Sequence, residues 1–267
     1  MEGTAVALWM PAFMRPLTAR ESPFGRLSVF HDTVHDAHIL VNDTTWHGWQ
    51  FREPARLDEP TGYYAHGSPI AELMASLRPG ARVAVVGLGA GVMASLAARG
   101  QAVTFFELDP AVIELARDPA CFSFLLRCEA RVSVREGDAV ERIVEAPPGA
   151  FDLIAVDAFS GDAVSEGVLS PRAVERFVSR LAPDGVAAFH LTSTTRGHDH
   201  RPEFARAARG LACAVRDHRS APLARDPSLE IDPAVDLSAP VECRWAVASP
   251  SPAAVARLAR WTPLSAP

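Results

Sequence analysis

The segment that decides the fold class is Arg82-Val83-Ala84-Val85-Val86-Gly87-Leu88-Gly89-Ala90-Gly91. Its first five residues form a short apolar run rich in valine, which predicts a buried β-strand. Three glycines then alternate with other residues, and residues 92–99 favour a helix. A strand that passes through a glycine turn into a helix is typical of nucleotide-binding α/β domains, because glycine lets a ligand approach the backbone at the helix start. Such a turn is also compatible with a tight connection that holds no ligand.

The segments around this turn alternate between strand and helix. We expect helices at residues 70–77, 110–116 and 171–181, where prolines or a Pro-Gly pair mark the boundaries. We expect strands at residues 102–106, 132–134, 151–156 and 185–191. Strands that alternate with helices in this way predict an α/β protein with a doubly wound, mostly parallel sheet.

Residues 20–52 have a different pattern. Short β-like segments at 26–30 and 38–41 are separated from the next one by Asn42-Asp43, which is typical of a turn. We therefore expect a small N-terminal antiparallel sheet. The chain would then divide into an N-terminal β-rich domain with its linker, residues 1–62, and a Rossmann-like domain, residues 63–267.

The C-terminal part gives weaker signals. We expect a helix at residues 203–215, a loop at 219–240, a strand at 244–248 and a terminal helix at 253–260.

Acidic residues follow three of the predicted strands. In an open parallel sheet, ligands bind beyond the carboxyl ends of the strands. Glu107 follows the strand expected at 102–106, Asp138 comes shortly after the one at 132–134, and Asp157 follows the one at 151–156. We expect all three to lie near the glycine turn, at the same edge of the sheet. Glu107 is placed to accept hydrogen bonds from ribose hydroxyls and Asp138 from an adenine amine, while Asp157 faces what lies beyond the ribose. The combination predicts an adenosyl site. Asp157 could instead cap the loop that follows it.

A nicotinamide dinucleotide is the alternative ligand. Its fingerprint is G-x-G-x-x-G with an acidic residue about 20 positions further on. Here the third glycine comes one residue early, Val92 stands at the expected position, and Glu107 lies too close. An acid after the third strand is also foreign to that scheme, so we favour an adenosyl sulfonium ligand.

Composition narrows the choice of partners. The formal net charge of −6 does not favour a nucleic-acid partner, whereas it suits a cationic small molecule as well as simple solubility. The four cysteines have no C-x-x-C spacing, so we predict no metal site. The N-terminus lacks the pattern of a secretory signal and no segment has the length of a membrane span. We expect a cytoplasmic protein without a membrane partner.

Several motifs resemble the polyamine aminopropyltransferases, the spermidine synthase-like family, and in particular a divergent bacterial branch whose members are often fused to a transporter. The resemblance spans about residues 21–195. It rests on segments that surround the predicted site: Glu21-Ser22-Pro23-Phe24-Gly25, residues 42–50, Tyr63-Tyr64-Ala65-His66, the glycine turn, residues 106–110, Gly137-Asp138, and residues 156–162.

The resemblance implies a class I S-adenosylmethionine-dependent methyltransferase fold with a small N-terminal β-domain, and a homodimer. It implies that S-adenosylmethionine or its decarboxylated form binds at Gly87, Gly89, Gly91, Glu107 and Asp138. Gln50 and one tyrosine of the pair, which we take as Tyr64, would contact this donor. Asp157 would lie beside the attacking amine, with Asp162 as a second acid, one residue out of register with the family pattern.

One departure from the family pattern bears on the transferred group. Polyamine synthases carry G-G-G-D-G at the glycine turn, and Ala90 replaces the aspartate that faces the donor's ammonium. Three hypotheses therefore stand: an aminopropyltransferase acting on a small amine, a transferase of methyl or 3-amino-3-carboxypropyl groups to another nucleophile, and a non-catalytic binder of an adenosyl ligand.

Overall fold

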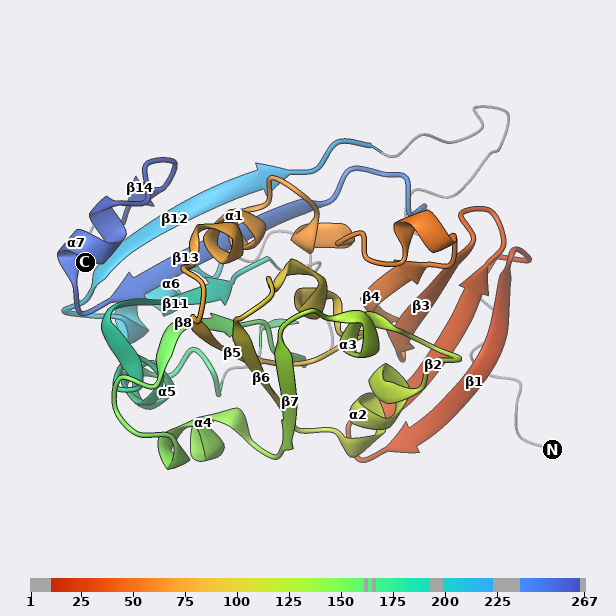
Figure 1. The fold of residues 1–267 in the computed structure, drawn as a ribbon, viewed down its shortest axis with the longest axis horizontal. Coiled ribbons are helices and arrows are strands. Elements are labelled where there is room, and N and C mark those ends of the chain that lie inside the picture. Colours follow the sequence, from red (N-terminus) through yellow and green to blue (C-terminus); the bar gives the residue numbers. More distant parts are fainter. Residues whose placement is uncertain (1–10, 161–162, 165–166, 193–198, 223–235, 265–267) are drawn as a thin grey trace.

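The computed structural model describes residues 11–160, 163–164, 167–192, 199–222 and 236–264. Two sheets make up its frame, one at each side of the molecule in Figure 1. The smaller is an antiparallel meander of four strands in chain order, β1 (Met14–Ser22), β2 (Gly25–Asp32), β3 (Ala37–Asn42) and β4 (Thr45–Phe51). Asp43 adopts a φ of 51° in the turn after β3, which confirms the turn predicted at Asn42-Asp43.

The larger sheet has eight strands in the order β14-β12-β13-β11-β8-β5-β6-β7. Five neighbouring strands, in the order β11-β8-β5-β6-β7, run parallel to one another. The strand β13 runs antiparallel to both β11 and β12. The strand bounds are β5 (Arg82–Val86), β6 (Ala102–Glu107), β7 (Arg131–Glu136), β8 (Phe151–Val156), β11 (Leu181–His190), β12 (Ala212–Arg219), β13 (Glu242–Ser249) and β14 (Thr262–Pro263). A short hairpin, β9 (Phe159–Ser160) and β10 (Ala163–Val164), follows β8.

Helices cover both faces of this sheet (Figure 1). They are α1 (Pro69–Ser76), α2 (Pro110–Arg117), α3 (Phe124–Arg127), α4 (Ala139–Arg142), α5 (Pro171–Val178), α6 (Arg201–Ala207) and α7 (Pro252–Ala256), with 3-10 helices η1 (Pro54–Arg56), η2 (Gly62–Tyr64), η3 (Val92–Leu96) and η4 (Ile143–Glu145). Successive side chains of β5 enter different cores, Val83 and Val85 on one face and Ala84 and Val86 on the other. A strand buried on both faces explains the unbroken apolar run in its sequence.

The small sheet also packs on two sides. Leu27, Val29 and Leu40 belong to the main core, while Phe30 and Ile39 belong to a separate small core. The architecture is therefore the predicted one, a mostly parallel doubly wound sheet with a small N-terminal antiparallel sheet. The domain boundary at residue 62 stays a prediction.

Three predicted helices are wrong in part. Residues 203–215 do not form one helix, because α6 ends at Ala207 and residues 212–219 form β12, which pairs with β13 along its whole length. The helix expected over 92–99 is the 3-10 helix η3 of five residues. The terminal helix is also shorter than expected, since α7 ends at Ala256 and the chain then enters β14.

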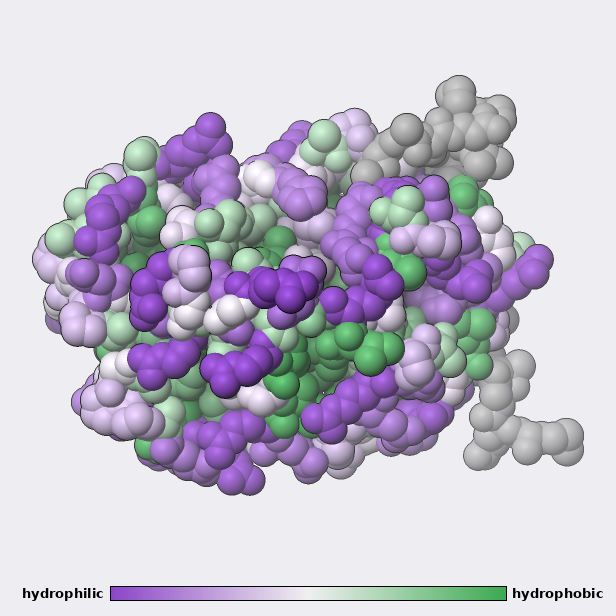
Figure 2. Space-filling view, in the orientation of Figure 1, coloured by the Kyte–Doolittle hydropathy of each residue, from purple (hydrophilic) through white to green (hydrophobic). Residues whose placement is uncertain are grey.

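The surface seen in Figure 2 is mostly hydrophilic, and the apolar side chains on this face gather around α3, where Leu126 is 78% exposed. Across the described part of the chain, every helix is too short or too polar to cross a membrane.

Candidate active site

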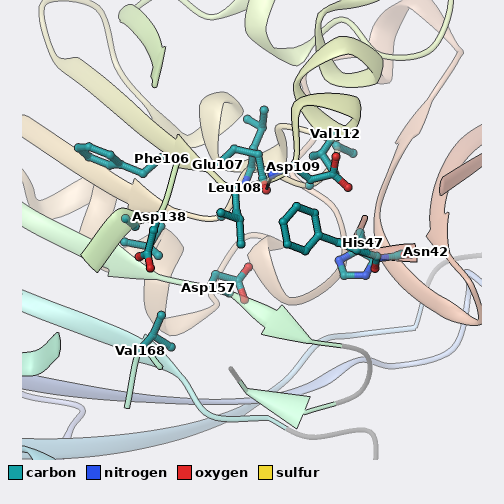
Figure 3. Close-up of a pocket in the computed structure, with 18 of the residues that line it drawn as sticks. Asn42, His47, Phe106, Glu107, Leu108, Asp109, Val112, Asp138, Asp157 and Val168 are labelled. Atoms are coloured by element: carbon teal, nitrogen blue, oxygen red, sulfur yellow. Dashed lines mark hydrogen bonds between the residues drawn. The ribbon is translucent and has the colours of Figure 1, made fainter. Parts of the chain in front are cut away.

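The site lies where the strand order of the large sheet reverses. From β5 the sheet continues through β6 to β7 on one side and through β8 to β11 on the other. In open α/β sheets, ligands bind beyond the strand ends at this point. A cavity of about 650 Å³ lies there, lined by the glycine turn, by strand ends and by residues of the small sheet. Figure 3 shows Asp138 at one end of the pocket, His47 and Asn42 at the other, and Glu107 and Asp157 between them.

Two glycines of the turn are required by their neighbours. Gly87 has a φ of 94°, and a Cβ atom there would overlap the carbonyl oxygen of Asp157. Gly89 has a φ of 53°, and its Cβ would lie 2.5 Å from the carbonyl oxygen of His47. The same His47 carbonyl accepts a hydrogen bond from the Ala90 amide at 3.0 Å. The turn is thus fitted between β8 and β4, and both glycines line the pocket, whereas Gly91 lies outside the lining.

Glu107 ends β6 and is held by the backbone on both sides. Its Oε2 accepts from the Leu88 amide and its Oε1 from the Asp109 amide, each at 2.9 Å. Burial raises the pKa of this carboxyl, while backbone hydrogen bonds from Asp109, Leu88 and Leu108 act in the opposite direction. A carboxylate has about four acceptor positions, so this one can still accept from a ligand.

Asp138 and Asp109 have one property in common, because each caps the helix that follows its strand. Asp138 Oδ1 accepts from the Val140 amide at the start of α4. Asp109 Oδ1 accepts from the Ala111 amide at the start of α2, and its Oδ2 accepts from the Ser22 hydroxyl at 2.6 Å. Asp109 therefore ties the small sheet to the large one, while both side chains line the pocket.

Asp157 follows β8 and both of its carboxylate oxygens are hydrogen-bonded. Oδ2 accepts from the hydroxyl of Tyr64, and Oδ1 accepts from Nδ1 of His190 at 2.8 Å. The side chains of Asp157 and His190 are only 5% and 3% exposed. Burial, followed by the charge of Asp157, raises the pKa values of Tyr63 and Tyr64 well above the ordinary tyrosine value, so both phenols stay neutral.

Gln50, by contrast, lies away from the pocket. Its amide donates to the Leu57 carbonyl at 2.8 Å and to the Ser123 hydroxyl at 2.9 Å, and its oxygen accepts from the Ser123 amide at 2.8 Å. These bonds join β4 to the linker and to the segment before α3. The predicted contact between Gln50 and a donor stays a prediction. Asp162 lies outside the described residues.

Three pocket-region residues escaped the sequence-based prediction: His47, Tyr63 as a second tyrosine near Asp157, and His190. The signal for His190 was available, because it is the last residue of β11 and the strand-end rule applies to β11 as it does to β8. No cluster of three or more metal-ligating side chains occurs within the described ranges.

Several solved structures have a similar α/β fold. They include spermidine synthase from Thermotoga maritima, with a TM-score of 0.60 and 14% identity over 91% of this chain and 75% of that chain. A probable spermidine synthase from Corynebacterium glutamicum has a TM-score of 0.58 and 17% identity, over 88% of this chain and 80% of that one. Precorrin-6y C5,15-methyltransferase from Geobacter metallireducens has a TM-score of 0.50 and 15% identity, over 68% of this chain and 85% of that one.

These likenesses support the predicted class I methyltransferase-like fold with its small N-terminal sheet, and at such identities they show the fold alone. No protein-family model and no curated protein matches the chain.

Proposed function

We propose that this chain is a transferase that binds S-adenosylmethionine or decarboxylated S-adenosylmethionine and moves an alkyl group, most directly aminopropyl, to an amine acceptor. The observation that carries the proposal is that the glycine turn, Glu107, Asp138 and Asp157 line one cavity in the order that an adenosyl sulfonium requires. One solved structure of similar fold is spermidine synthase in complex with a transition-state analogue, with a TM-score of 0.58 and 14% identity over 91% of this chain and 75% of that chain.

The adenosine half fits the acids at the ends of β6 and β7. Glu107 has acceptor capacity left for a ribose hydroxyl beyond its backbone donors. Asp138 has one oxygen engaged in capping α4, which leaves the other for an exocyclic amine. Phe24 and Leu108 line the same pocket while 48% and 49% exposed, and they offer apolar surface to a purine ring.

The charge of the pocket suits a ligand with a positively charged reacting group. Four carboxylates line the pocket, and among its described lining residues there is no arginine to neutralise them. Transfer from a sulfonium is an in-line displacement whose leaving group departs as a neutral thioether, so the site's contribution is alignment of nucleophile, carbon and sulfur. An amine acceptor must lose a proton, and the Asp157–Tyr64 pair is placed to attract and orient its ammonium form.

Ala90 supports a second candidate, a methyl- or 3-amino-3-carboxypropyltransferase that uses S-adenosylmethionine itself. Its side chain is 1% exposed and lines the pocket, so it brings no charge to the donor's amino group. A donor that keeps its carboxylate neutralises its own ammonium and depends less on an acid at this position.

Calorimetric titration and product analysis separate these functions. We expect S-adenosylmethionine, its decarboxylated form, or both to bind, while a nicotinamide dinucleotide does not. With a panel of amine acceptors, mass spectrometry should then detect 5′-methylthioadenosine for aminopropyl or aminocarboxypropyl transfer, or S-adenosylhomocysteine for methyl transfer. Binding of neither adenosyl donor would refute the proposal, and binding without either product would favour the non-catalytic binder.

A further inference from the structure

His190 lies beside Asp157 and is not among the residues that line the pocket. The two residues stand at the ends of the neighbouring parallel strands β11 and β8, where Phe189 pairs with Val156. Asp157 lines the pocket and His190 does not. His190 therefore acts on a ligand through its pocket-lining neighbours Asp157 and Tyr63.

The imidazole ring is held by aromatic neighbours on two sides. Its centroid lies 4.3 Å from that of Tyr63 and 4.9 Å from that of Trp245, which stacks on it at an interplanar angle of 20°. The side chain is 3% exposed. A ring held in this way fixes the direction of its Nδ1 atom, which lies 2.8 Å from Asp157 Oδ1.

The hydrogen bond also identifies the donor atom. A carboxylate oxygen accepts, so we assign the proton of this bond to Nδ1 of His190. Tyr64 donates to the other oxygen. A buried charge is costly unless donors compensate it, and these two donors compensate the charge of Asp157 where water scarcely reaches.

Two phenols and one thiol near this carboxylate remain neutral. Tyr63 and Tyr64 of η2 have raised pKa values, and burial raises the pKa of Cys243 on β13 to about 12. Arg216 and Asp217 of β12 act on Cys243 with opposite signs. Glu107 of β6 is the remaining acid on the neighbouring strands that line the pocket.

We infer that His190 is a positioning residue that orients the Asp157 carboxylate, so that this side of the pocket selects ligands with a positive sulfur over neutral thioethers. The inference rests on the proposed function for the identity of the ligand. It assigns to His190 a role in charge selectivity that is separate from binding the adenosine half.

Two variants with two ligands test this role. His190→Phe keeps a ring between Tyr63 and Trp245 but removes the donor, whereas His190→Gln keeps a donor amide. S-adenosylmethionine carries the sulfonium, and S-adenosylhomocysteine is the neutral thioether with the same adenosine and the same amino-acid chain. We expect H190F to weaken S-adenosylmethionine binding by about tenfold or more while it changes S-adenosylhomocysteine binding less than about twofold. We expect H190Q to restore most of the lost selectivity.

If H190F weakens the binding of both ligands equally, His190 is a packing residue only. If H190F leaves the binding of both ligands unchanged, His190 has no role in the site. Failure of H190Q to restore selectivity would also overturn the role of the hydrogen bond. Thermal unfolding of each variant shows whether it is folded at the titration temperature.

A measurement on the unmodified protein without any ligand shows which ring nitrogen of His190 carries the proton. Long-range ¹H–¹⁵N spectra at neutral pH, with His190 assigned through its backbone, should show a protonated Nδ1. A neutral ring protonated at Nε2 alone would overturn the inference even if the variants do not fold. If the unmodified protein binds neither adenosyl ligand, the proposed function fails, and this spectrum still decides the His190–Asp157 bond.

Discussion

Gly87 and Asp157 are in backbone contact, because a Cβ atom on Gly87 would overlap the carbonyl oxygen of Asp157. The first glycine of the turn and the acid at the end of the neighbouring strand thus fix each other's position. The glycine turn, which we assign to the adenosyl donor, and Asp157, which we assign to the amine acceptor, therefore meet at one backbone contact.

Substitution of Gly87 by alanine should disrupt this junction. We expect Gly87→Ala to lower the free energy of unfolding by at least about 2 kcal/mol and to abolish binding of adenosyl ligands, because β8 must move away. Gly100 is a matched control, since its φ of 88° is similar but its Cβ would meet nothing within 4 Å. Urea unfolding of G100A should show only the backbone strain, about 1 kcal/mol, with ligand binding retained. Equal effects in both variants would contradict the junction.

Glu107 should leave a signature in the pH dependence of stability. Burial raises its pKa in the folded protein above the ordinary value of 4.5. At pH values between 4.5, the pKa in the unfolded chain, and the raised pKa in the folded protein, the folded state binds more protons than the unfolded state. The free energy of unfolding therefore falls as pH rises through this range. Glu107→Gln removes this contribution. We expect the stability difference between the unmodified protein and E107Q to shift in favour of E107Q as pH rises above 4.5, as measured by urea unfolding at several pH values. A pH-independent difference would contradict the raised pKa.

Gln50 provides a test of a structural role against a ligand contact. We expect Gln50→Ala to lower the free energy of unfolding by about 1–3 kcal/mol, because the partly buried Ser123 amide loses its acceptor. Affinity for S-adenosylmethionine should change less than about threefold, since Gln50 does not line the pocket. Gln101→Ala is the control, because Gln101 is also buried and its oxygen accepts from the Ala98 amide. A larger loss of affinity in Q50A than in Q101A would restore the donor contact that the family resemblance implies.

Ala90 allows the two candidate donors to be separated by charge. We expect Ala90→Asp to shift the ratio of dissociation constants by about tenfold toward decarboxylated S-adenosylmethionine, whose ammonium has no carboxylate of its own. Ala90→Asn has the same shape without the charge and should leave the ratio near its original value. Titration calorimetry measures both constants. An equal shift in A90N would attribute the change to shape instead of charge.

Much of this arrangement was accessible from the sequence, because it depends on local patterns. Glu107, Asp138 and Asp157 each follow a recognisable strand, and parallel pairing of β5 to β8 brings strand ends to one edge. The strand β12 was missed, since Ala212-Cys213-Ala214 has helix-favouring alanines and its extended form depends on pairing with the distant β13. The hydrogen bonds between Gln50 and Ser123 are likewise non-local, because Ser123 is 73 positions further on.

The fit between β4 and the glycine turn has an evolutionary consequence. A Cβ atom on Gly48 would lie 3.1 Å from the Cβ of Ala90 and 3.2 Å from Val92. A larger residue at position 48 therefore displaces the turn that shapes the pocket. Positions 48 and 90 should consequently vary together in size across related sequences, so that the small sheet and the glycine turn are inherited as one unit and not exchanged separately.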